Sequence, residues 1–360
     1  MTRTELFELQ AEMPDEEIYT KIKKNWDSLA KPIDGLGAFE EIHCRIGAIR
    51  GNCHPNLSKK ELLILCADNG VVAEGVTQTG QEVTAQVAAL MAKGKSSVGI
   101  MAKDYPLSIV PVDIGINSTQ KIEGLLDKRV APGTRNFVCE PAMTREECLS
   151  AVGIGIELVQ DAKKRETGLI LTGEMGIGNT TTSTALLCAL TGADPDTVTG
   201  RGAGLDDAGL QKKKAVIAEG LSFHGLTEID RPLSREAAFD ALCKVGGLDL
   251  AGMVGIFLGG MRCGLPVVID GLISAVAALM AEHLVPGCKA FMIASHAGKE
   301  QGCEQVLQAL GLHSVIDAQM ALGEGTGAVL LLPMLDMAAA LYEEGTGFSD
   351  TEIAEYKRLH

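Results

Sequence analysis

The sequence predicts an α/β protein whose parallel sheet is covered by helices on both faces. Short apolar runs alternate with helical stretches along most of the chain. Each run is hydrophobic throughout, as expected for a strand that is buried on both sides, and ends in Gly, Asp or Ser. Ligands bind beyond the carboxyl ends of the strands in such sheets, so the polar residues after each run are the first candidates for function.

The chain opens with helices. Residues 1–30 are charged, carry spaced Leu, Ile and Trp and lack glycine, which predicts a helix. A turn with Pro and Gly at 32–37 precedes a second helical segment, in which apolar residues recur at helical spacing from Phe39 to Ile49. We therefore expect a helical piece before the first strand.

The predicted strands come next, and a long helix closes the pattern. The strands lie at 61–70, 107–115, 168–176, 265–271 and 289–298. Residues 328–347 are predicted to be a helix, because a long apolar run ends in Glu-Glu-Gly, a typical helix C-terminus.

Composition excludes several classes of protein. A chain of 360 residues that is 46% hydrophobic can bury a large core. Its net charge of −15 disfavours nucleic acid and anionic membranes, and 4% aromatic residues offer no stacking platform for single strands. We find no run of about 20 uninterrupted apolar residues and no signal-peptide core, so we expect a cytoplasmic protein that spans no membrane.

The cysteines indicate reduced thiols. Ten are scattered without a CxxC pair, several of them inside apolar runs. The best metal candidate, His43-Cys44 with Cys53-His54, fits no zinc module well, so we favour ordinary packing there and expect no metal.

The stretch GEMGIGNTTTSTAL at 173–186 is the most informative glycine-rich loop. It has the GxxxxG spacing of a phosphate loop, but Asn179-Thr180 stands where Lys-Ser/Thr is required for polyphosphate and magnesium. Backbone N–H groups and a helix N-terminus remain, which suit a single phosphate. The alternative is a plain strand-helix turn with Thr180 to Ser183 as capping residues. The presence of Glu174 favours a functional role for this loop over a plain turn. An acid beside a phosphate cradle would repel the phosphate unless it served another part of the ligand.

Three further polar edges follow predicted strands. In the stretch at 199–217, Gly200, Gly202 and Gly204 can present backbone N–H groups, and Asp206-Asp207 is predicted to cap a helix that carries three adjacent lysines. One of these lysines could reach the crevice, but the spacing does not show which. The edge at 67–91 supplies Gln81 and Gln86. The edge at 294–302 supplies Ser295, His296 and Gly298.

The tetrapeptide Glu-Gly-Thr-Gly occurs twice. Glu344 follows a predicted helix, where Gly345 is a natural C-cap and the carboxylate is solvated. Glu324 instead lies among Gly323, Gly325 and Gly327 before the helix begins. These glycines allow close backbone approach to a ligand, so we favour function for Glu324 alone.

An ordered set of motifs identifies a family resemblance. KPIDGLGAFE, ADNGVVAEGV, GEMGIGNTTT, GRGAGLDDAGL, GGLDLAGMVG, VVIDGLISAVAAL, ASHAGKEQG and LGEGTGA resemble the nicotinate-nucleotide:dimethylbenzimidazole phosphoribosyltransferases of cobalamin assembly. The resemblance runs from about residue 20 to 345. It implies a homodimer with a large Rossmann-like domain at 61–327 and a smaller, mainly helical domain built from 1–60 and 328–360.

The resemblance also implies a reaction. The phosphoribosyl group of nicotinate mononucleotide would move to a benzimidazole, giving an α-ribazole phosphate and nicotinate, with no cofactor. A purine or phenol acceptor, or a non-catalytic binder on the same fold, are the alternatives. An enzyme that uses the pyrophosphorylated ribose donor would need magnesium and an acidic pair, for which Asp206-Asp207 is the adjacent candidate.

Site residues follow from the matching motifs. The resemblance places the catalytic base on Glu324, with Glu174 and Lys213 as further catalytic residues. We assign two binding sets. Phosphate and ribose are assigned to Gly176, Gly178, Asn179, Thr180, Gly202, Ser295 and Gly298, and the base to Gln81, Gln86, Met175 and Leu322.

Two stretches depart from the family pattern. Gly298 stands where relatives usually have Ser, so only its backbone N–H is available for a phosphate. GVTQTGQEVT lacks the aromatic-Pro pair common in relatives, which leaves the identity of the accepted base open.

Overall fold

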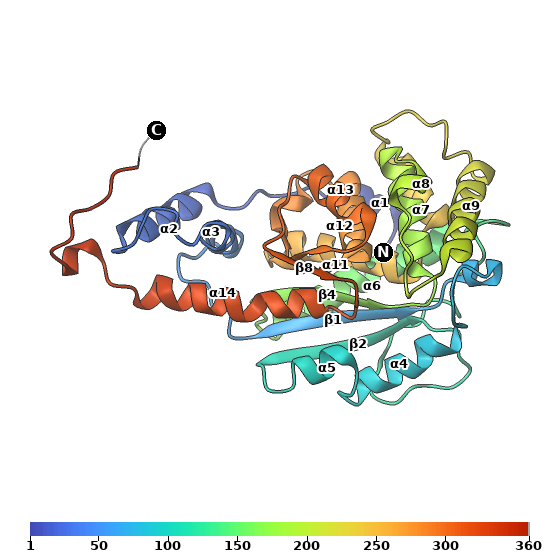
Figure 1. Ribbon diagram of the computed structural model, residues 1–360, viewed down its shortest axis with the longest axis horizontal. Helices are drawn as coiled ribbons and strands as arrows, with labels where there is room; N and C mark the ends of the chain where they lie inside the picture. The colour runs from blue at the N-terminus through green and yellow to red at the C-terminus, as the bar shows by residue number, and fades with distance from the viewer. Residues whose placement is uncertain (359–360) are drawn as a thin grey trace.

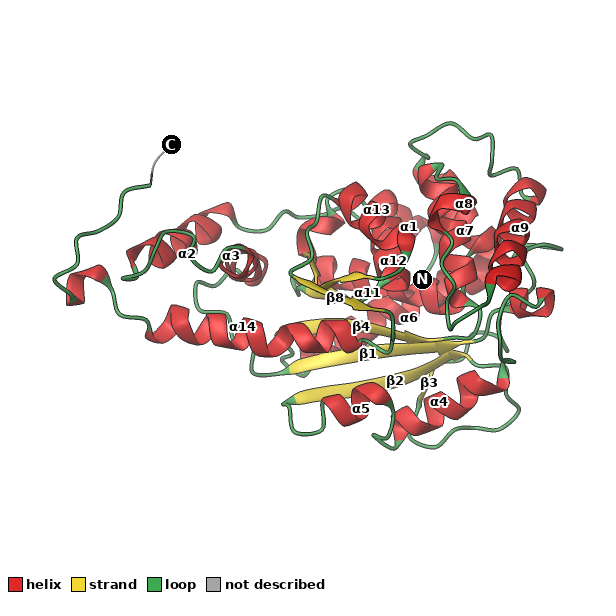
Figure 2. Cartoon of the chain, viewed as in Figure 1, coloured by secondary structure: helices red, strands yellow, loops and turns green. Residues whose placement is uncertain are grey.

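A computed structural model describes residues 1–358 of the chain. Its centre is a parallel six-stranded sheet in the order β3-β2-β1-β4-β5-β6 (Figure 1 and Figure 2). This is the strand order of a Rossmann fold, in which the chain reverses direction across the sheet between β1 and β4. The predicted Rossmann-like sheet is therefore confirmed. The strands of this sheet are β1 (Lys60–Ala67), β2 (Leu107–Gly115), β3 (Leu126–Asp127), β4 (Leu169–Met175), β5 (Val267–Ile269) and β6 (Met292–Ala294).

Helices cover the sheet on both sides. Their bounds, in chain order, are α1 (Arg3–Glu8), α2 (Glu16–Ser28), α3 (Ala38–Arg50), α4 (Glu82–Ala92), α5 (Ser97–Met101), α6 (Arg145–Lys164), α7 (Asn179–Thr191), α8 (Pro195–Val198), α9 (Asp207–Phe223), α10 (Arg235–Val245), α11 (Leu248–Cys263), α12 (Leu272–Leu284), α13 (Gln301–Leu310) and α14 (Thr326–Glu344). Short 3₁₀ turns are η1 (Gly70–Glu74), η2 (Cys288–Phe291) and η3 (Phe348–Asp350).

The residues of β1 explain the two layers. All eight are buried, and alternate side chains point to opposite faces of a strand. Leu63, Leu65 and Ala67 join the core beneath α6, α7 and α10–α12, whereas Leu62 and Ile64 join the core beneath α4, α5 and α14. A strand flanked by two cores needs a continuous apolar run, which is what the sequence pattern contained.

A smaller lobe projects from the sheet, at the left of Figure 1. There α2 and α3 pack against the C-terminal half of α14 around Ile22, Trp26, Cys44 and Tyr342. By contrast, α1 lies on the main core, where Leu6 is buried. The domain boundaries at residues 60 and 327 remain predictions.

Two secondary-structure expectations were wrong in part, and a further strand was missed. The helix expected over 1–30 is two helices, because residues 9–15, with Pro14, leave the helical path between them. The strand expected over 289–298 begins as the 3₁₀ turn η2, and its last residues leave the main sheet to form β7 (His296–Gly298). β7 pairs with β8 (Ile316–Met320), a short and mostly exposed strand that lacks the continuous apolar run by which the other strands were predicted.

By length and composition alone, α14 could cross a membrane. However, half of its most apolar window is buried against the protein, and Asp336 within it forms an ion pair with the buried Lys60. It contacts α3, α5 and β4 and is therefore a core helix of this fold.

Candidate active site

A pocket of about 270 Å³ opens at the carboxyl ends of β1 and β4. The order of the sheet reverses between these two strands, and this is where ligands bind in doubly wound folds. The loops that follow β4, precede α9 and precede α14 all reach it. Ten residues that we assigned to the site line this pocket. They are Glu174, Met175, Gly176, Gly178, Asn179, Thr180, Gly202, Lys213, Leu322 and Glu324.

The loop between β4 and α7 forms the floor. Gly176 passes so close to β1 that an added Cβ would lie 2.3 Å from the carbonyl oxygen of Ala67. Gly178, with φ +95°, is the N-cap residue of α7 and has no side chain that could cap the helix. The N-terminal end of α7 therefore faces the pocket without a side-chain acceptor. The capping alternative is not what forms, because the hydroxyls of Thr182 and Ser183 donate to the carbonyl of Asn179. A helix N-terminus of this kind favours an anion.

One lysine of the three faces this floor. Lys213 is only 1% exposed and its Nζ donates to Thr180 Oγ1 at 2.8 Å, whereas Lys212 is exposed and Lys214 faces Asp196. Burial lowers the pKa of Lys213 to about 8. Gly202 has to be glycine, because a Cβ there would lie 2.9 Å from Thr180 Oγ1. Backbone, hydroxyl and ammonium groups thus converge at one end of the pocket.

A chain of polar contacts fixes Glu174 on the wall. Asn179 Nδ2 donates to Glu174 and also to Asp249 Oδ2, the latter at 3.1 Å. Burial, together with the charges of the neighbouring Asp249, Asp270 and Glu300, raises the pKa of Glu174 to about 8, against the hydrogen bond from Asn179. Glu174 is therefore largely protonated at neutral pH in the free protein.

Glu324 also lines the pocket, in a strained backbone conformation. Its φ of +60° lies in the left-handed region that side chains other than Gly and Asn rarely adopt. Its carboxylate Oε2 accepts the backbone N–H of Val98, at the start of α5, at 3.0 Å. The loop passes close to β4, since a Cβ on Gly323 would lie 2.6 Å from Glu174 Oε1. A strained acid at the mouth of a pocket suggests a functional constraint.

Asp270 anchors the loop that carries Glu324. Its buried carboxylate accepts the backbone N–H groups of Gly325, Gly327 and Ala328 at 3.2, 2.9 and 3.0 Å. It caps the start of α14 from the end of β5, and burial raises its pKa to about 7. The sequence analysis did not single out Asp270. The signal was present, because this acid ends the predicted strand LPVVIDG.

The remaining predicted site residues do not line this pocket. The side-chain amide of Gln81 donates to the carbonyl of Asn69 and accepts a hydrogen bond from Asn117. Gln86 is exposed on α4. Ser295 is fully buried, and its hydroxyl donates to the carbonyl of Ile269 at 2.6 Å, so it is not free to bind phosphate. Gly298 lies in β7, beyond the pocket lining.

Other sequence predictions can be placed as well. Glu344 is exposed at the end of α14 and Gly345 is the C-cap, as expected. Asp206 caps α9 through the N–H of Gly209, as expected. His43 packs against the rings of Trp26 and Tyr342.

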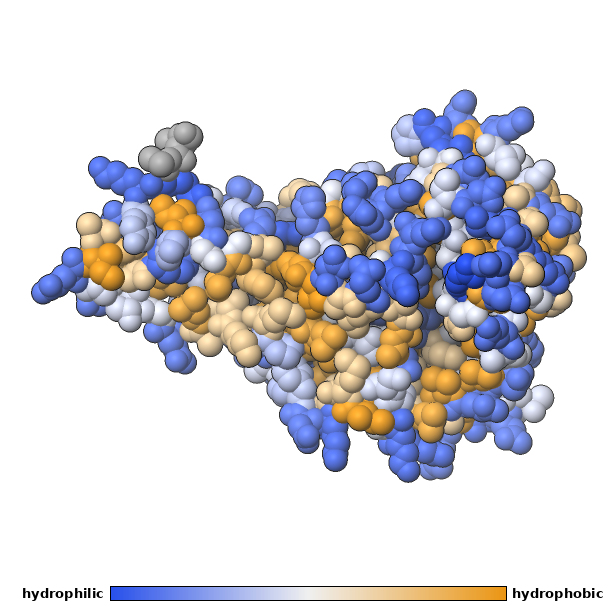
Figure 3. All heavy atoms as spheres, in the orientation of Figure 1, coloured by the Kyte–Doolittle hydropathy of each residue, from blue (hydrophilic) through white to orange (hydrophobic). Residues whose placement is uncertain are grey.

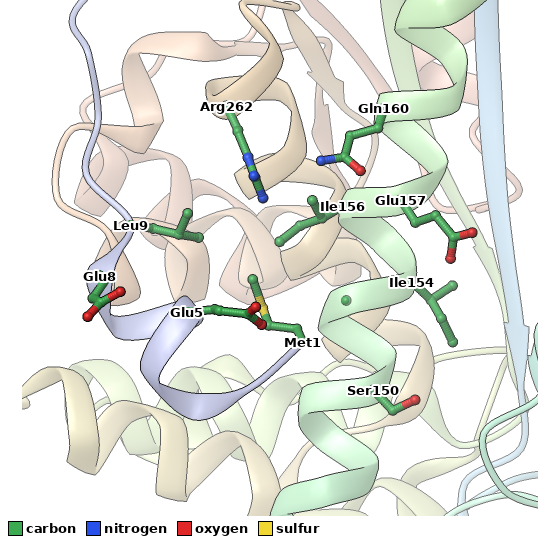
Figure 4. A pocket seen from close by; sticks show the side chains of 11 residues that line it. Met1, Glu5, Glu8, Leu9, Ser150, Ile154, Ile156, Glu157, Gln160 and Arg262 are labelled. Carbon is green, nitrogen blue, oxygen red and sulfur yellow. The ribbon is translucent and has the colours of Figure 1, made fainter.

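A larger hollow of about 590 Å³ lies elsewhere, between α1, α6 and α11 (Figure 4). Its lining includes Met1, Glu5, Glu157 and Arg262. Arg262 lies at the C-terminal end of α11, whereas Leu248 at the other end packs near Gly115 at the end of β2. The hollow is therefore away from the carboxyl ends of the strands, and we place the active site in the smaller pocket.

Comparisons with known proteins find relatives over nearly the whole chain. A family described as phosphoribosyltransferase matches residues 11–353. The nicotinate-nucleotide–dimethylbenzimidazole phosphoribosyltransferase of Acetivibrio thermocellus is 38% identical over 336 residues, covering 93% of this chain and 94% of the relative. The protein of the same name from Clostridium acetobutylicum is 39% identical, with 96% of each chain covered. The crystal structure of CobT from Thermus thermophilus superimposes with a TM-score of 0.86 at 35% identity, covering 94% of this chain and 100% of that one.

Proposed function

This chain belongs to the family of nicotinate-nucleotide–dimethylbenzimidazole phosphoribosyltransferases, and we propose that it transfers the phosphoribosyl group of nicotinate mononucleotide to 5,6-dimethylbenzimidazole. The products are nicotinate and α-ribazole 5′-phosphate, which supplies the nucleotide loop of cobalamin. One observation supports this most strongly: a single pocket brings together an anion cradle, Lys213 and two carboxylates, Glu174 and Glu324.

The leaving group explains why the loop needs no lysine of the P-loop type. The pyridinium of nicotinate mononucleotide is a cation and departs as a neutral pyridine nitrogen, so no negative charge builds up on it. The donor carries one phosphate, which the N-terminal end of α7, Thr180 and Lys213 can bind. The catalytic task is then to assist the incoming base.

Glu324 is the residue we assign to that task. One nitrogen of the benzimidazole attacks the anomeric carbon, and the proton on the other nitrogen becomes acidic as positive charge develops on the ring. A carboxylate beside that proton stabilises the charge and removes the proton, which is worth about 10²–10⁴-fold in rate. Attack from the face opposite the leaving group converts a β-nucleotide into an α-product.

Glu174 and Lys213 take supporting roles in this proposal. Glu174 faces the ribose and balances the positive charge that develops on it as the bond to the pyridinium breaks. Developing positive charge lowers the pKa of a neighbouring carboxyl, so Glu174 ionises when it is needed. Lys213 contacts the substrate phosphate. Met175 and Leu322 border the base.

The alternatives receive no separate support. The relatives share one name, and none of them is described as a binder or as an enzyme for purines or phenols. The polar residues Thr77, Gln78 and Thr79 line the pocket, so base preference is the property to survey once activity is established.

Release of nicotinate tests the proposal. Nicotinate mononucleotide and dimethylbenzimidazole are incubated with the protein in EDTA, and nicotinate is followed by chromatography. We expect release that depends on the added base and persists without free metal. No release under any metal condition would overturn the proposal, and activity abolished by EDTA would favour the pyrophosphorylated donor.

We also propose that the protein is a homodimer. Exposed apolar residues line α14 at Leu330, Met337 and Leu341, with Met337 72% exposed, and α5 beside it adds Ile100 at 65%. Figure 3 shows this apolar surface along α14. This apolar surface adjoins the loop that carries Glu324. A second copy of the chain packed against this surface would therefore help to close the pocket.

The mass in solution checks the dimer. Light scattering coupled to gel filtration should give twice the chain mass, and Met337→Glu should shift it towards the monomer. The exposed control Met13→Glu should not. A monomeric wild type would overturn this assignment.

The ten free cysteines, most of them buried, support our further proposal that the enzyme works in the reducing cytoplasm.

A further inference from the structure

We propose that Glu300 binds the ribose of the donor nucleotide by accepting hydrogen bonds from its 2′- and 3′-hydroxyls. The inference rests on the proposed function and extends it to a residue for which the sequence analysis proposed no role. It follows from three features of Glu300: the state of its carboxylate, its position along the pocket, and the charges around it.

The first feature is that the carboxylate of Glu300 accepts no hydrogen bond from another residue of the part of the chain that the structure describes. The other acids at the pocket are engaged: Glu174 by Asn179, Glu324 by the N–H of Val98, and Asp270 by three N–H groups of α14. Within residues 1–358, the Glu300 carboxylate interacts with its own backbone N–H but receives no other hydrogen bond and forms no ion pair. It is therefore the acid at this pocket that is free to accept from a ligand.

The second feature is where Glu300 lies. It is the N-cap residue of α13, yet its side chain does not cap the helix and lines the pocket instead. Its Cγ would lie 3.6 Å from a Cβ on Gly200, close in sequence to the Gly202 of the phosphate end. Glu300 also borders a small cavity of about 30 Å³ together with Glu174 and with Leu322 and Gly323, the segment that leads into Glu324.

Glu300 therefore borders both the phosphate end of the pocket and the segment that leads into Glu324. Lys213, Thr180 and Gly202 mark the phosphate end, and Glu324 marks the end for the base. In a nucleotide the ribose links phosphate and base, so a residue that borders both ends faces the sugar.

The third feature is charge, which limits what Glu300 can bind. The phosphate and the carboxylate of nicotinate are anions and are repelled by a carboxylate. The N–H of the acceptor base is used by Glu324 in the proposed reaction. The vicinal hydroxyls of ribose are neutral donors, and a carboxylate can accept both of them, one on each oxygen.

Burial explains why such a contact would be strong. Desolvation raises the pKa of Glu300, and Lys213 opposes that rise. A carboxylate that is partly removed from water without hydrogen-bond donors is costly, and substrate hydroxyls would supply the missing donors.

The variant should fold normally. Glu300 raises the pKa values of Glu174 and Asp270, which means that its charge repels theirs. Replacing it with a neutral residue removes that repulsion and breaks no hydrogen bond to another residue. We therefore expect the melting temperature of Glu300→Gln and Glu300→Ala to be unchanged or raised.

Donor analogues test the assignment. The ratio kcat/KM is measured for nicotinate mononucleotide and for its 2′-deoxy and 3′-deoxy analogues, at saturating dimethylbenzimidazole. The enzymes are the wild type, Glu300→Gln, Glu300→Ala and the control Glu304→Gln, an exposed glutamate of the same helix that contacts only Gln308.

We expect Glu300→Ala to lower kcat/KM for the ribonucleotide about 10- to 100-fold, the effect of losing a hydrogen bond to a charged group. The deoxy analogues should lose much less, so the preference for ribose collapses. Glu300→Gln should fall between, and Glu304→Gln should match the wild type. A preference that is the same in Glu300→Ala and wild type, or a loss confined to the KM of the base, would overturn the inference.

Equilibrium binding separates this result from the proposed function. The dissociation constants of the same three nucleotides are measured by calorimetry in the absence of base. If wild type releases no nicotinate, the proposed reaction fails, but the comparison of ribose with deoxyribose in wild type and Glu300→Ala still decides the role of Glu300.

Discussion

Replacing Glu324 with Gln removes a proton acceptor while preserving the shape of the loop. The two side chains are nearly isosteric, and the amide oxygen of Gln can still accept the N–H of Val98. The backbone at φ +60° is equally strained in both proteins, because neither residue favours the left-handed region. We therefore expect the free energy of unfolding to change by less than about 1 kcal/mol.

The effect on catalysis should be much larger. Loss of a general base slows a reaction about 10²–10⁴-fold, which corresponds to about 2.7–5.4 kcal/mol of transition-state stabilisation. The loss should appear in kcat. The KM of the base should change only a few-fold, because the apolar contacts around the ring, such as those of Met175 and Leu322, are untouched.

Steady-state kinetics with saturating nicotinate mononucleotide measure this effect. The matched control is Glu344→Gln, in the second Glu-Gly-Thr-Gly copy, where the carboxylate is exposed at the end of α14. Circular dichroism melting shows that both variants are folded. Equal and mild effects from the two substitutions would refute the assignment of Glu324 as the base.

Three further predictions concern the supports of the site. Asp270→Asn should destabilise the protein by about 1–3 kcal/mol and lower kcat, since an amide nitrogen would face the N–H groups at the start of α14; an unchanged denaturation midpoint would contradict the anchoring role. Gly327→Ala should cost about 1–3 kcal/mol, because its Cβ would lie 1.9 Å from Nδ1 of His296, whereas Gly347→Ala, with nothing nearer than 3.3 Å, should change stability by less than about 0.5 kcal/mol in the same urea titration. Glu174 has a folded pKa of about 8 against an ordinary value of 4.5, so the native state keeps a proton that the unfolded state loses between these values. The ligand-free protein should therefore lose stability as pH rises from about 5 to 8, and Glu174→Gln should lose less; parallel melting curves across this range would argue against a raised pKa.

Much of the fold could be predicted from short stretches of sequence. The strand β1 was recognisable because a strand between two cores is apolar on both faces. The elements that were missed lack such a pattern. β3 has two exposed residues, and β8 is mostly exposed, so neither carries a burial signal.

The site was predictable to the extent that single loops define it. Gly178 and the uncapped start of α7 belong to one continuous segment, and the contrast between Glu324 and Glu344 follows from which side of a helix each one occupies. The error at Ser295 has a different origin. Its hydroxyl is consumed by the carbonyl of Ile269, a residue of the neighbouring strand β5, which no local pattern reveals.

The sequence by itself determined the class of sheet, the positions of the glycine loops and which Glu-Gly-Thr-Gly copy precedes the long C-terminal helix and which follows it. Hydrophobic periodicity and the conformational freedom of glycine are properties of neighbouring residues, so they can be read locally. The tertiary structure decided that Lys213 is the lysine that meets Thr180, 33 residues away, that Asp270 holds the loop 55 residues further on, and that Glu300 is left without a donor from another residue. These outcomes depend on which groups are buried together and which hydrogen bonds are already satisfied, and only the packed chain brings those groups within reach of one another.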